Sequence, residues 1–380
     1  FGGSGAGPVS VSGTNATLVG GGNSSVFEFG GGASGGLAFG GVNAVTLSAA
    51  GNNDTLVGSS AATSVTLSGA GDLFFGAAGA TTVSAGGAND VMVGGGQSTM
   101  LFTAGATDGV AFGGTDAVTL SDAGSGETLV GSAATTAVTL GGSAAVYFGE
   151  GTGSSIVGSG TGSDTILAGS AATAVTAGGS SLVVFGGGGT LNFVGGSAGA
   201  TVVGGAGDAT VTGGLGGTTL FGGNGSFVRY LGSAGSLLFA AGAGNDTLDA
   251  SASTSNNVMF AGSDTAGRNS IVGGQGPGQG NDTLVAGAGT DTLVGNSNPS
   301  STDLFVFMKT AGVAREATIL NFTASDQMWL AGYGANVAAA ALSAAAVDAN
   351  SVTLTLSDNT TIVLSGISDA GSLAGHVVST

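Results

Sequence analysis

Aspartates that follow glycines in nine-residue units are the groups in this chain whose type and spacing could do chemistry. Two units stand in tandem from Gly278 to Gly295, GQGNDTLVA and GAGTDTLVG, and a third, GAGNDTLDA, spans Gly242 to Ala250. Glycine permits a tight turn with positive φ and leaves backbone carbonyls exposed. Carbonyl and carboxylate oxygens are the ligands that calcium takes. The apolar residue two places after each Asp is expected to begin a short strand and to point inward.

These units resemble the calcium-binding nonapeptide GGxGxDxUx of the RTX, or haemolysin-type, proteins, in which U is a large apolar residue. In that family, Asp side chains and turn carbonyls of neighbouring coils share each ion. By position, the resemblance implies that calcium is bound by one Asp and one glycine of each unit: Asp246, Asp282, Asp291, Gly244, Gly280 and Gly289. Degraded repeats place further Asp residues before strands like TLV, and these become weaker candidates: Asp54, Asp90, Asp164 and Asp208. The alternative is that all of them are solvated turn residues, since Asp is common in such turns.

The chain is repetitive on two scales. From Phe1 to about Ala250, short apolar triplets return at a spacing near nine and are followed by Gly, Ser or Ala. This spacing predicts strands of three to five residues joined by tight turns. A longer period, close to four times the first, is superimposed on it and is marked by phenylalanines that precede glycine: Phe39, Phe75, Phe112, Phe148, Phe185 and Phe221. The repeating block therefore comprises four strands, and the shorter period is typical of a solenoid.

Two windings could accommodate this block. In a β-roll, a coil takes about 18 residues and like residues lie ~9.5 Å apart, whereas a coil of four strands would stack them at ~4.8 Å. Each nonapeptide offers one or two bulky inward groups, which favours the thin core of the smaller coil; the phenylalanine ladder would fit the larger coil better. We predict an all-β protein, a parallel β-solenoid of the RTX-like β-roll type, in which each coil spends two nonapeptide units and the superrepeat spans two coils.

Three regions are expected along the chain. Residues 1–241 form a degenerate glycine-rich solenoid, 242–300 carry the RTX-like calcium repeats, and 301–380 form a β-rich cap that includes an Ala-rich helix near 337–347. The order of segments after Asp303 resembles the C-terminal region that closes the β-roll in RTX proteins and carries their type I secretion signal. The final VVST departs from the strongly hydrophobic ending of some members. A cap would cover the open end of the last coil.

Composition excludes several classes of function. Only 7% of residues are charged, the net charge is −18, and no Lys or Arg precedes Arg229, so nucleic acid and anionic membranes are poor partners whereas cations are good ones. Apolar runs are too short for a membrane-spanning helix, so membrane insertion is not expected. There is no Cys, and His376 is the only His, which removes thiol and HExxH chemistry. Paired carboxylates remain a formal alternative, but we expect no enzyme.

We therefore predict a secreted, extracellular, non-catalytic structural protein of a bacterial cell surface or matrix: a filament, surface layer or adhesin stalk. Calcium would stabilise it, most strongly over 242–300, and copies would associate end to end or laterally. A type I exporter and a cell-surface polysaccharide are the other expected partners. One alternative is an ice- or polysaccharide-binding face with regularly spaced threonines: Thr46, Thr66, Thr119 and Thr139. Another is the export module of a larger secreted enzyme, because Phe1 lies within a repeat and the chain is either a fragment or processed.

Overall fold

The computed structural model describes residues 7–22, 24–179, 181–224, 228–231, 237–275, 278, 280–310 and 312–380. The chain divides into two compact units, unit 1 (Phe1–Val184) and unit 2 (Phe185–Thr380). The fold is an all-β parallel β-solenoid of about 16 turns with roughly 18 residues per coil and 3% helix. The predicted fold class is therefore confirmed.

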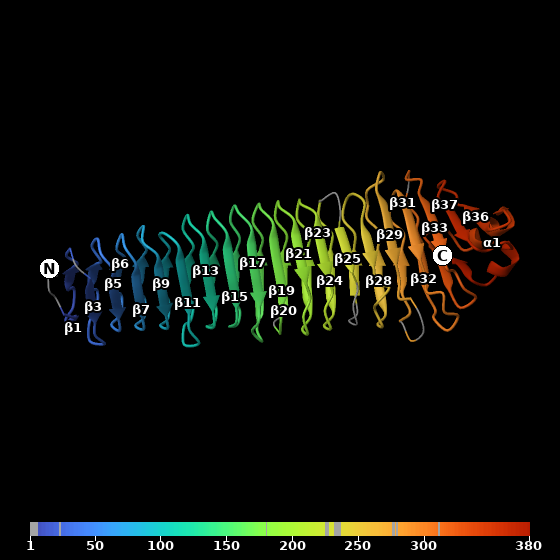
Figure 1. Ribbon diagram of the computed structural model, residues 1–380. Helices are drawn as coiled ribbons and strands as arrows, with labels where there is room; N and C mark the ends of the chain where they lie inside the picture. Colours follow the sequence, from blue (N-terminus) through green and yellow to red (C-terminus); the bar gives the residue numbers. More distant parts are fainter. Residues whose placement is uncertain are drawn as a thin grey trace. The chain divides into compact units, whose positions relative to one another are not determined.

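Unit 1 consists of two parallel sheets, and each coil contributes one strand to each of them (Figure 1). The strands of the first sheet are β1 (Val9–Val11), β3 (Ser25–Phe29), β5 (Val45–Ala49), β7 (Thr63–Leu67), β9 (Thr81–Ala85), β11 (Ser98–Phe102), β13 (Val118–Asp122), β15 (Thr136–Leu140), β17 (Ser154–Gly158) and β19 (Thr173–Ala177). The strands of the second sheet are β2 (Thr17–Val19), β4 (Leu37–Phe39), β6 (Thr55–Val57), β8 (Leu73–Phe75), β10 (Val91–Val93), β12 (Val110–Phe112), β14 (Thr128–Val130), β16 (Val146–Phe148) and β18 (Ser163–Leu167). The strand β20 (Ser181–Phe185) follows them.

The register of the strands agrees with the length of one coil. Val45 pairs with Thr63 in the first sheet, and Thr55 pairs with Leu73 in the second. Both pairs join residues that are separated by one coil of the solenoid. Successive strands of one sheet therefore come from successive coils. This confirms the smaller winding and excludes a coil that uses four strands.

The core of unit 1 is a thin layer between the two sheets. The five-residue strands bury every second side chain: in β7, Thr63, Val65 and Leu67 are buried while the residues between them are exposed. The three-residue strands bury only their middle residue, such as Phe74 in β8. Each fully buried large apolar side chain contributes about 1.5–3 kcal/mol, and the same position recurs in every coil, so stability accumulates coil by coil.

The phenylalanines that mark the longer period lie on the outer surface. Phe39, Phe75, Phe112 and Phe148 end three-residue strands of the second sheet and are 38–42% exposed. In the ladder each of them is next to a smaller residue, as Phe75 is next to Val57 and Val93. The preference of this ladder for a larger coil assumes rings that point inward; here they point outward. Neighbouring strands are only ~4.8 Å apart, so large and small groups alternate and the period spans two coils.

The turns show the same alternation. Asn53 adopts φ +58° and Gly71, one coil later, adopts φ +72°. A Cβ added to Gly71 would lie 2.8 Å from the side-chain oxygen of Asn53. The amide of one coil thus occupies the space that a side chain of the next would need, and glycine is required at this turn of the next coil.

Unit 2 also has two parallel sheets, and its later coils are longer than its first ones. Its first parallel sheet consists of β21 (Leu191–Val194), β23 (Ala209–Thr212), β25 (Val228–Leu231), β27 (Thr247–Asp249), β29 (Arg268–Val272), β31 (Thr290–Val294), β33 (Glu316–Leu320) and β37 (Thr361–Ser365). Its second consists of β22 (Ala200–Val203), β24 (Thr218–Phe221), β26 (Leu237–Ala240), β28 (Asn257–Phe260), β30 (Thr283–Val285), β32 (Leu304–Met308), β34 (Gln327–Ala331) and β38 (Val377–Ser379). Val258 pairs with Thr283, which is a longer step along the chain than any in unit 1, because loops are inserted there.

The C-terminal part of unit 2 departs from the solenoid. β36 (Ser351–Thr355) and β37 pair antiparallel, and β35 (Ala346–Val347) adds to β36. The Ala-rich segment begins as the helix α1 (Val337–Ser343), and a 3-10 helix spans Ala370–Leu373. The predicted boundaries at 241 and 300 both fall within unit 2. Among the described residues, neither helix has the length and apolar character needed to cross a membrane.

Candidate metal centre

Three aspartates of unit 1 form a buried column. Asp54, Asp72 and Asp90 each precede a three-residue strand of the second sheet, follow one another at intervals of one coil, and are each 0% exposed. One carboxylate oxygen, Oδ1, accepts a backbone N–H from the preceding coil: Asp54 from Gly36 at 2.7 Å, Asp72 from Asp54 at 2.9 Å and Asp90 from Asp72 at 3.0 Å. The column therefore ties consecutive coils together.

The second oxygen of each carboxyl has no donor. Oδ2 of Asp54, Asp72 and Asp90 is buried without a hydrogen-bond partner. A Cβ added to Gly69 would lie 1.4 Å from the carbonyl oxygen of Gly51 and 3.1 Å from Oδ2 of Asp72, so these two oxygens are close neighbours. The next coil repeats the arrangement around Gly87, with the Gly69 carbonyl and Asp90. Calcium takes such oxygens at about 2.3–2.6 Å, and the pair is near enough to share one ion.

Electrostatics makes an ionised column costly. Burial raises the pKa of all three carboxyls, and that of Asp72 reaches about 7 because the charges of Asp90 and Asp54 add to the effect. No Lys or Arg precedes Arg229 in the sequence, so no cationic side chain of unit 1 can neutralise them. Either protons or a bound cation must therefore compensate the buried charge.

A second arrangement of this kind joins Asp122, at the end of β13, to Glu127, which precedes β14. Both are almost fully buried, and Oδ2 of Asp122 and both carboxylate oxygens of Glu127 have no hydrogen-bond partner. The nearby N–H groups of Glu127 and Ser125 lower the pKa of Glu127 without completing such a bond. Burial, followed by the charge of Asp122, raises the pKa of Glu127 to about 7. A Cβ added to Gly124 would lie 2.3 Å from Glu127 Oε1 and 2.7 Å from the carbonyl oxygen of Ala106. The surroundings are thus oxygens, and a proton or a cation must be shared there.

The two remaining upstream candidates differ from each other. Asp164 is buried, precedes the equivalent position in β18, and accepts the N–H of Ala145 at 3.1 Å, so it belongs to the same set of positions. Asp208 is exposed and precedes β23, which belongs to the first parallel sheet of unit 2. The structure therefore does not bring Asp208 into a buried column.

Asp246 and Asp291 occupy equivalent positions in unit 2, with Asn269 between them. The N–H of Asp246 donates to Oδ1 of Asn269 at 3.1 Å, and Nδ2 of Asn269 donates to Oδ1 of Asp291 at 2.9 Å. The second oxygen of Asp291 accepts the N–H of Gly287 at 2.7 Å. Asp246 accepts the N–H of Val228 at 2.8 Å, and its Oδ2 is buried without a partner. Of these two, only Asp246 retains an oxygen without a hydrogen-bond partner, and the nearby N–H of Gly242 lowers the pKa of this carboxyl without completing such a bond.

Asp282 starts a different column, in which donors engage both carboxylate oxygens. Its Oδ1 accepts from the backbone and side-chain nitrogens of Asn257 at 2.8 and 2.7 Å, and its Oδ2 accepts from Gly274 at 2.6 Å. Asp303 and Asp326 repeat this pattern one and two coils later, and each takes an N–H of its own turn. Burial still raises the pKa of Asp282, to about 6. Hydrogen bonds engage both oxygens of each carboxylate, and those to Oδ1 link neighbouring coils.

The turn glycines singled out in the sequence differ in backbone conformation. Gly244 and Gly289 have positive φ, at +101° and +90°. The carbonyl of Gly289 accepts the N–H of Glu316 at 3.0 Å, and that of Gly280 accepts the hydroxyl of Ser301 at 3.2 Å. Both carbonyls are thus already engaged in linking coils.

Sequence reasoning missed several buried carboxyls, namely Asp72, Asp122, Asp303 and Asp326. The signal for Asp72 was its spacing, because it lies midway between Asp54 and Asp90 in steps of one coil. The partnership of Asp122 with Glu127 had no such signal, because it depends on a strand end meeting the following turn.

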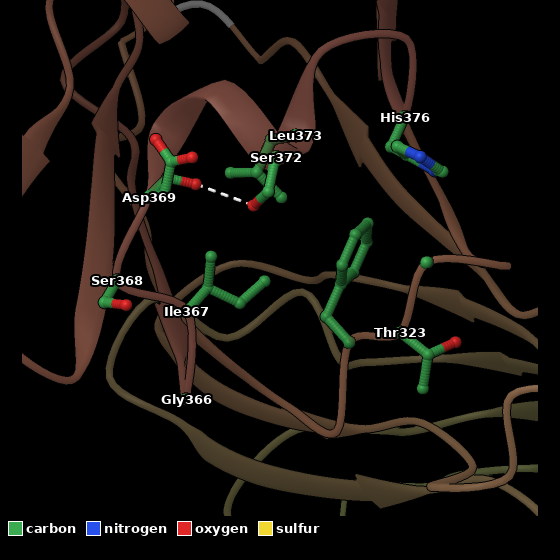
Figure 2. A pocket seen from close by; sticks show the side chains of 10 residues that line it. Thr323, Gly366, Ile367, Ser368, Asp369, Ser372, Leu373 and His376 are labelled. Carbon is green, nitrogen blue, oxygen red and sulfur yellow. Dashed lines mark hydrogen bonds between the residues drawn. The ribbon is translucent and has the colours of Figure 1, made fainter.

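The pocket that carries the single histidine lies in unit 2 and has a volume of about 370 Å³ (Figure 2). The hydroxyl of Ser372 donates to the main-chain oxygen of Asp369 at 2.7 Å, and the Asp369 carboxylate accepts the N–H of Gly371 at 2.8 Å. Nδ1 of His376 lies 3.0 Å from the carbonyl oxygen of Asp326. Figure 2 shows the His376 ring on the far side of the pocket from Asp369. These groups serve the local fold and are not arranged as a nucleophile with its base.

Comparison with known proteins adds no family. No family model, curated protein or solved structure matches this chain. The fold by itself defines the class as a β-solenoid repeat protein. Among the described residues, no three His, Cys, Asp or Glu side chains are grouped so that they could hold a metal ion. An ion in these columns would therefore take much of its coordination from backbone carbonyls.

Proposed function

We propose that this chain is a secreted, non-catalytic structural protein of a bacterial cell surface or extracellular matrix, stabilised by calcium and able to self-associate. The observation that carries the proposal is the stacking of coil upon coil through two parallel strand ladders, reinforced by buried carboxyl columns. In such a repeat each coil contacts mainly its neighbours, and length is added without a new core. The acidic, Cys-free composition and the resemblance to RTX proteins support export by a type I system.

Calcium is supported most directly in unit 1. Asp54, Asp72 and Asp90 would each supply the carboxylate oxygen that has no donor, and the neighbouring turn carbonyls would complete the oxygen ligands. Asp246 is the equivalent candidate in unit 2. Calcium would supply the positive charge that unit 1 lacks, and an ion that binds only the folded coils stabilises them by mass action.

The proposal is tested with the full chain in calcium and in chelator. Electron microscopy of concentrated protein is expected to show filaments or lateral arrays in calcium. Hydrogen exchange is expected to show stronger protection of residues 45–95 when calcium is present. A protein that stays monomeric at every concentration, with identical exchange in both conditions, would contradict the structural role.

A hydroxyl-bearing surface favours a second candidate, the binding of ice or a polysaccharide. In unit 1 the outward positions of the first sheet carry mainly Ser and Thr, and β5, β7, β9 and β13 each present two hydroxyl groups. The four threonines singled out in the sequence are exposed there: Thr46, Thr66, Thr119 and Thr139. Thermal hysteresis, or binding to a glycan array by the purified chain, would favour this function.

A further inference from the structure

The second sheet of unit 1 presents an uncharged outer surface, which we call the apolar strip. It consists of the first and third residues of the strands β2, β4, β6, β8, β10, β12, β14 and β16. Thr17, Thr55 and Thr128 are its only polar members, and all the others are Val, Leu or Phe. The first sheet has mainly hydroxyl groups at its outward positions, so the two faces of each coil differ in chemistry. The phenylalanines of the strip are exposed and its valines and leucines are half-buried. A contiguous apolar surface of this size is often an interaction site.

The strip has a regular relief. Phenylalanines stand at every second coil, ~9.6 Å apart, and a valine lies between each pair at half that distance. Phe75, Val93 and Phe112 are consecutive members of this ladder. Rings therefore form ridges, and the valines form furrows of the same period.

Building on the self-association proposed above, we infer that the partner of the apolar strip is the strip of a second copy of this chain, packed face to face with an offset of one coil. That offset places each phenylalanine ring of one copy over a valine of the other. A second copy has the same spacing of rings and valines, so the two strips match along their whole length. A chain of net charge −18 repels itself, so two copies approach best through a surface without charge. The hydroxyl face stays in water, which limits this contact to pairs of solenoids.

The contact area is small for a stable complex. Eight strands at ~4.8 Å, each about 10 Å long, give roughly 400 Å² per copy and about 800 Å² in total. Specific stable complexes bury about 1,200–2,000 Å². The pair is therefore expected to be weak and reversible, and to form at the high local concentration of a surface or matrix.

Sedimentation equilibrium of the full chain tests the inference. The double variant Phe75→Ser, Phe112→Ser keeps the fold because both rings are outside the core, and the dissociation constant should rise at least about 30-fold, since each ring would bury tens of Å². The matched control is Val157→Ser, because Val157 is 41% exposed, as Phe75 is, but lies on the first sheet. This control should leave association unchanged.

A second variant separates interdigitation from general stickiness. Val93→Phe adds apolar area but fills a furrow, so pairing of two strips should weaken although the surface becomes more hydrophobic. Binding to phosphatidylcholine vesicles would instead strengthen, and vesicle binding that rises with Val93→Phe while self-association does not fall would overturn the inference in favour of a lipid partner. Assembly that persists in the double Phe variant overturns the strip and leaves the structural role standing. A wild-type chain that never associates overturns both.

Discussion

Replacing Asp72 with Asn tests the buried carboxyl column of unit 1 at its centre. In the folded chain the pKa of this carboxyl is raised from 3.8 to about 7 by burial and by the charges of Asp90 and Asp54. Between about pH 4 and pH 7 the folded state therefore retains a proton that the unfolded state has lost. Without a cation, stability falls as pH rises through this window, by up to ~1.4 kcal/mol per pH unit. The total loss is about 2 to 4 kcal/mol and is complete above the folded pKa.

Asparagine keeps the oxygen that accepts the N–H of Asp54 and has no proton to lose. In chelator at pH 8, Asp72→Asn should therefore be more stable than wild type by about 2 kcal/mol or more, and at pH 4 the two should be similar. In the variant an amide NH2 group replaces Oδ2, the oxygen that has no donor in the wild type. This group can donate a hydrogen bond to the nearby carbonyl oxygen of Gly51. Calcium should stabilise the wild-type coils and have a smaller effect on the variant, because one carboxylate ligand is lost.

Hydrogen exchange of peptides within residues 45–95, corrected for intrinsic rates, reads these coils locally and does not require two-state unfolding. The matched control is Asp291→Asn. Both oxygens of Asp291 accept N–H donors, from Asn269 and Gly287, and an amide offers only one oxygen. This variant should lose about 1–3 kcal/mol of local stability at pH 8, read by exchange of the peptides that contain residue 291. A raised pKa and a destabilising charge at Asp72 are contradicted if Asp72→Asn also loses protection at pH 8 in chelator, or if wild-type protection is equal at pH 4 and pH 8.

Three further changes test other parts of the argument. Glu127→Gln removes a carboxyl whose pKa is raised to about 7 by burial and by Asp122. Hydrogen exchange over residues 118–130 should slow at pH 8 in chelator and change little at pH 4. Faster exchange at pH 8 would contradict a shared proton. Gly69→Ala forces a Cβ to 1.4 Å from a backbone oxygen and should lower the melting temperature or prevent folding, whereas Gly151→Ala meets nothing within 4 Å and should change stability by less than about 1 kcal/mol. Phe74→Ala empties a fully buried position and should cost about 3–5 kcal/mol in chemical denaturation; a loss below about 1 kcal/mol would contradict a packed core.

Most of the fold could be read from the sequence because its period is local. Apolar triplets that return with each nonapeptide already require short strands and turns, and the small number of bulky residues per unit already favours a thin core. The orientation of Phe75 could not be read in this way. A strand of three residues can bury either its middle residue or its two end residues. In β8 the strand register buries Phe74 between the two sheets and leaves Phe75 on the outer surface.

For the candidate site, the sequence predicted several of the aspartates that are involved but not how their oxygens are bonded. The nonapeptide pattern identified Asp246, Asp282 and Asp291, and all three are buried. Asp246 and Asp282 directly precede strands, whereas Asp291 lies within β31. Whether a carboxylate oxygen is free or already bonded depends on which N–H of the next loop reaches it. Gly274 reaches Asp282, while the tighter coils of unit 1 offer no such donor to Asp72.

Sequence alone thus determined a wound, glycine-rich, acidic β-solenoid, since spacing and composition fix strand length and charge. Only the tertiary structure decided which buried carboxylate oxygens lack a hydrogen-bond donor and which face is apolar. Both depend on contacts between neighbouring coils, such as the pairing of Val45 with Thr63, which join residues that are distant in the chain.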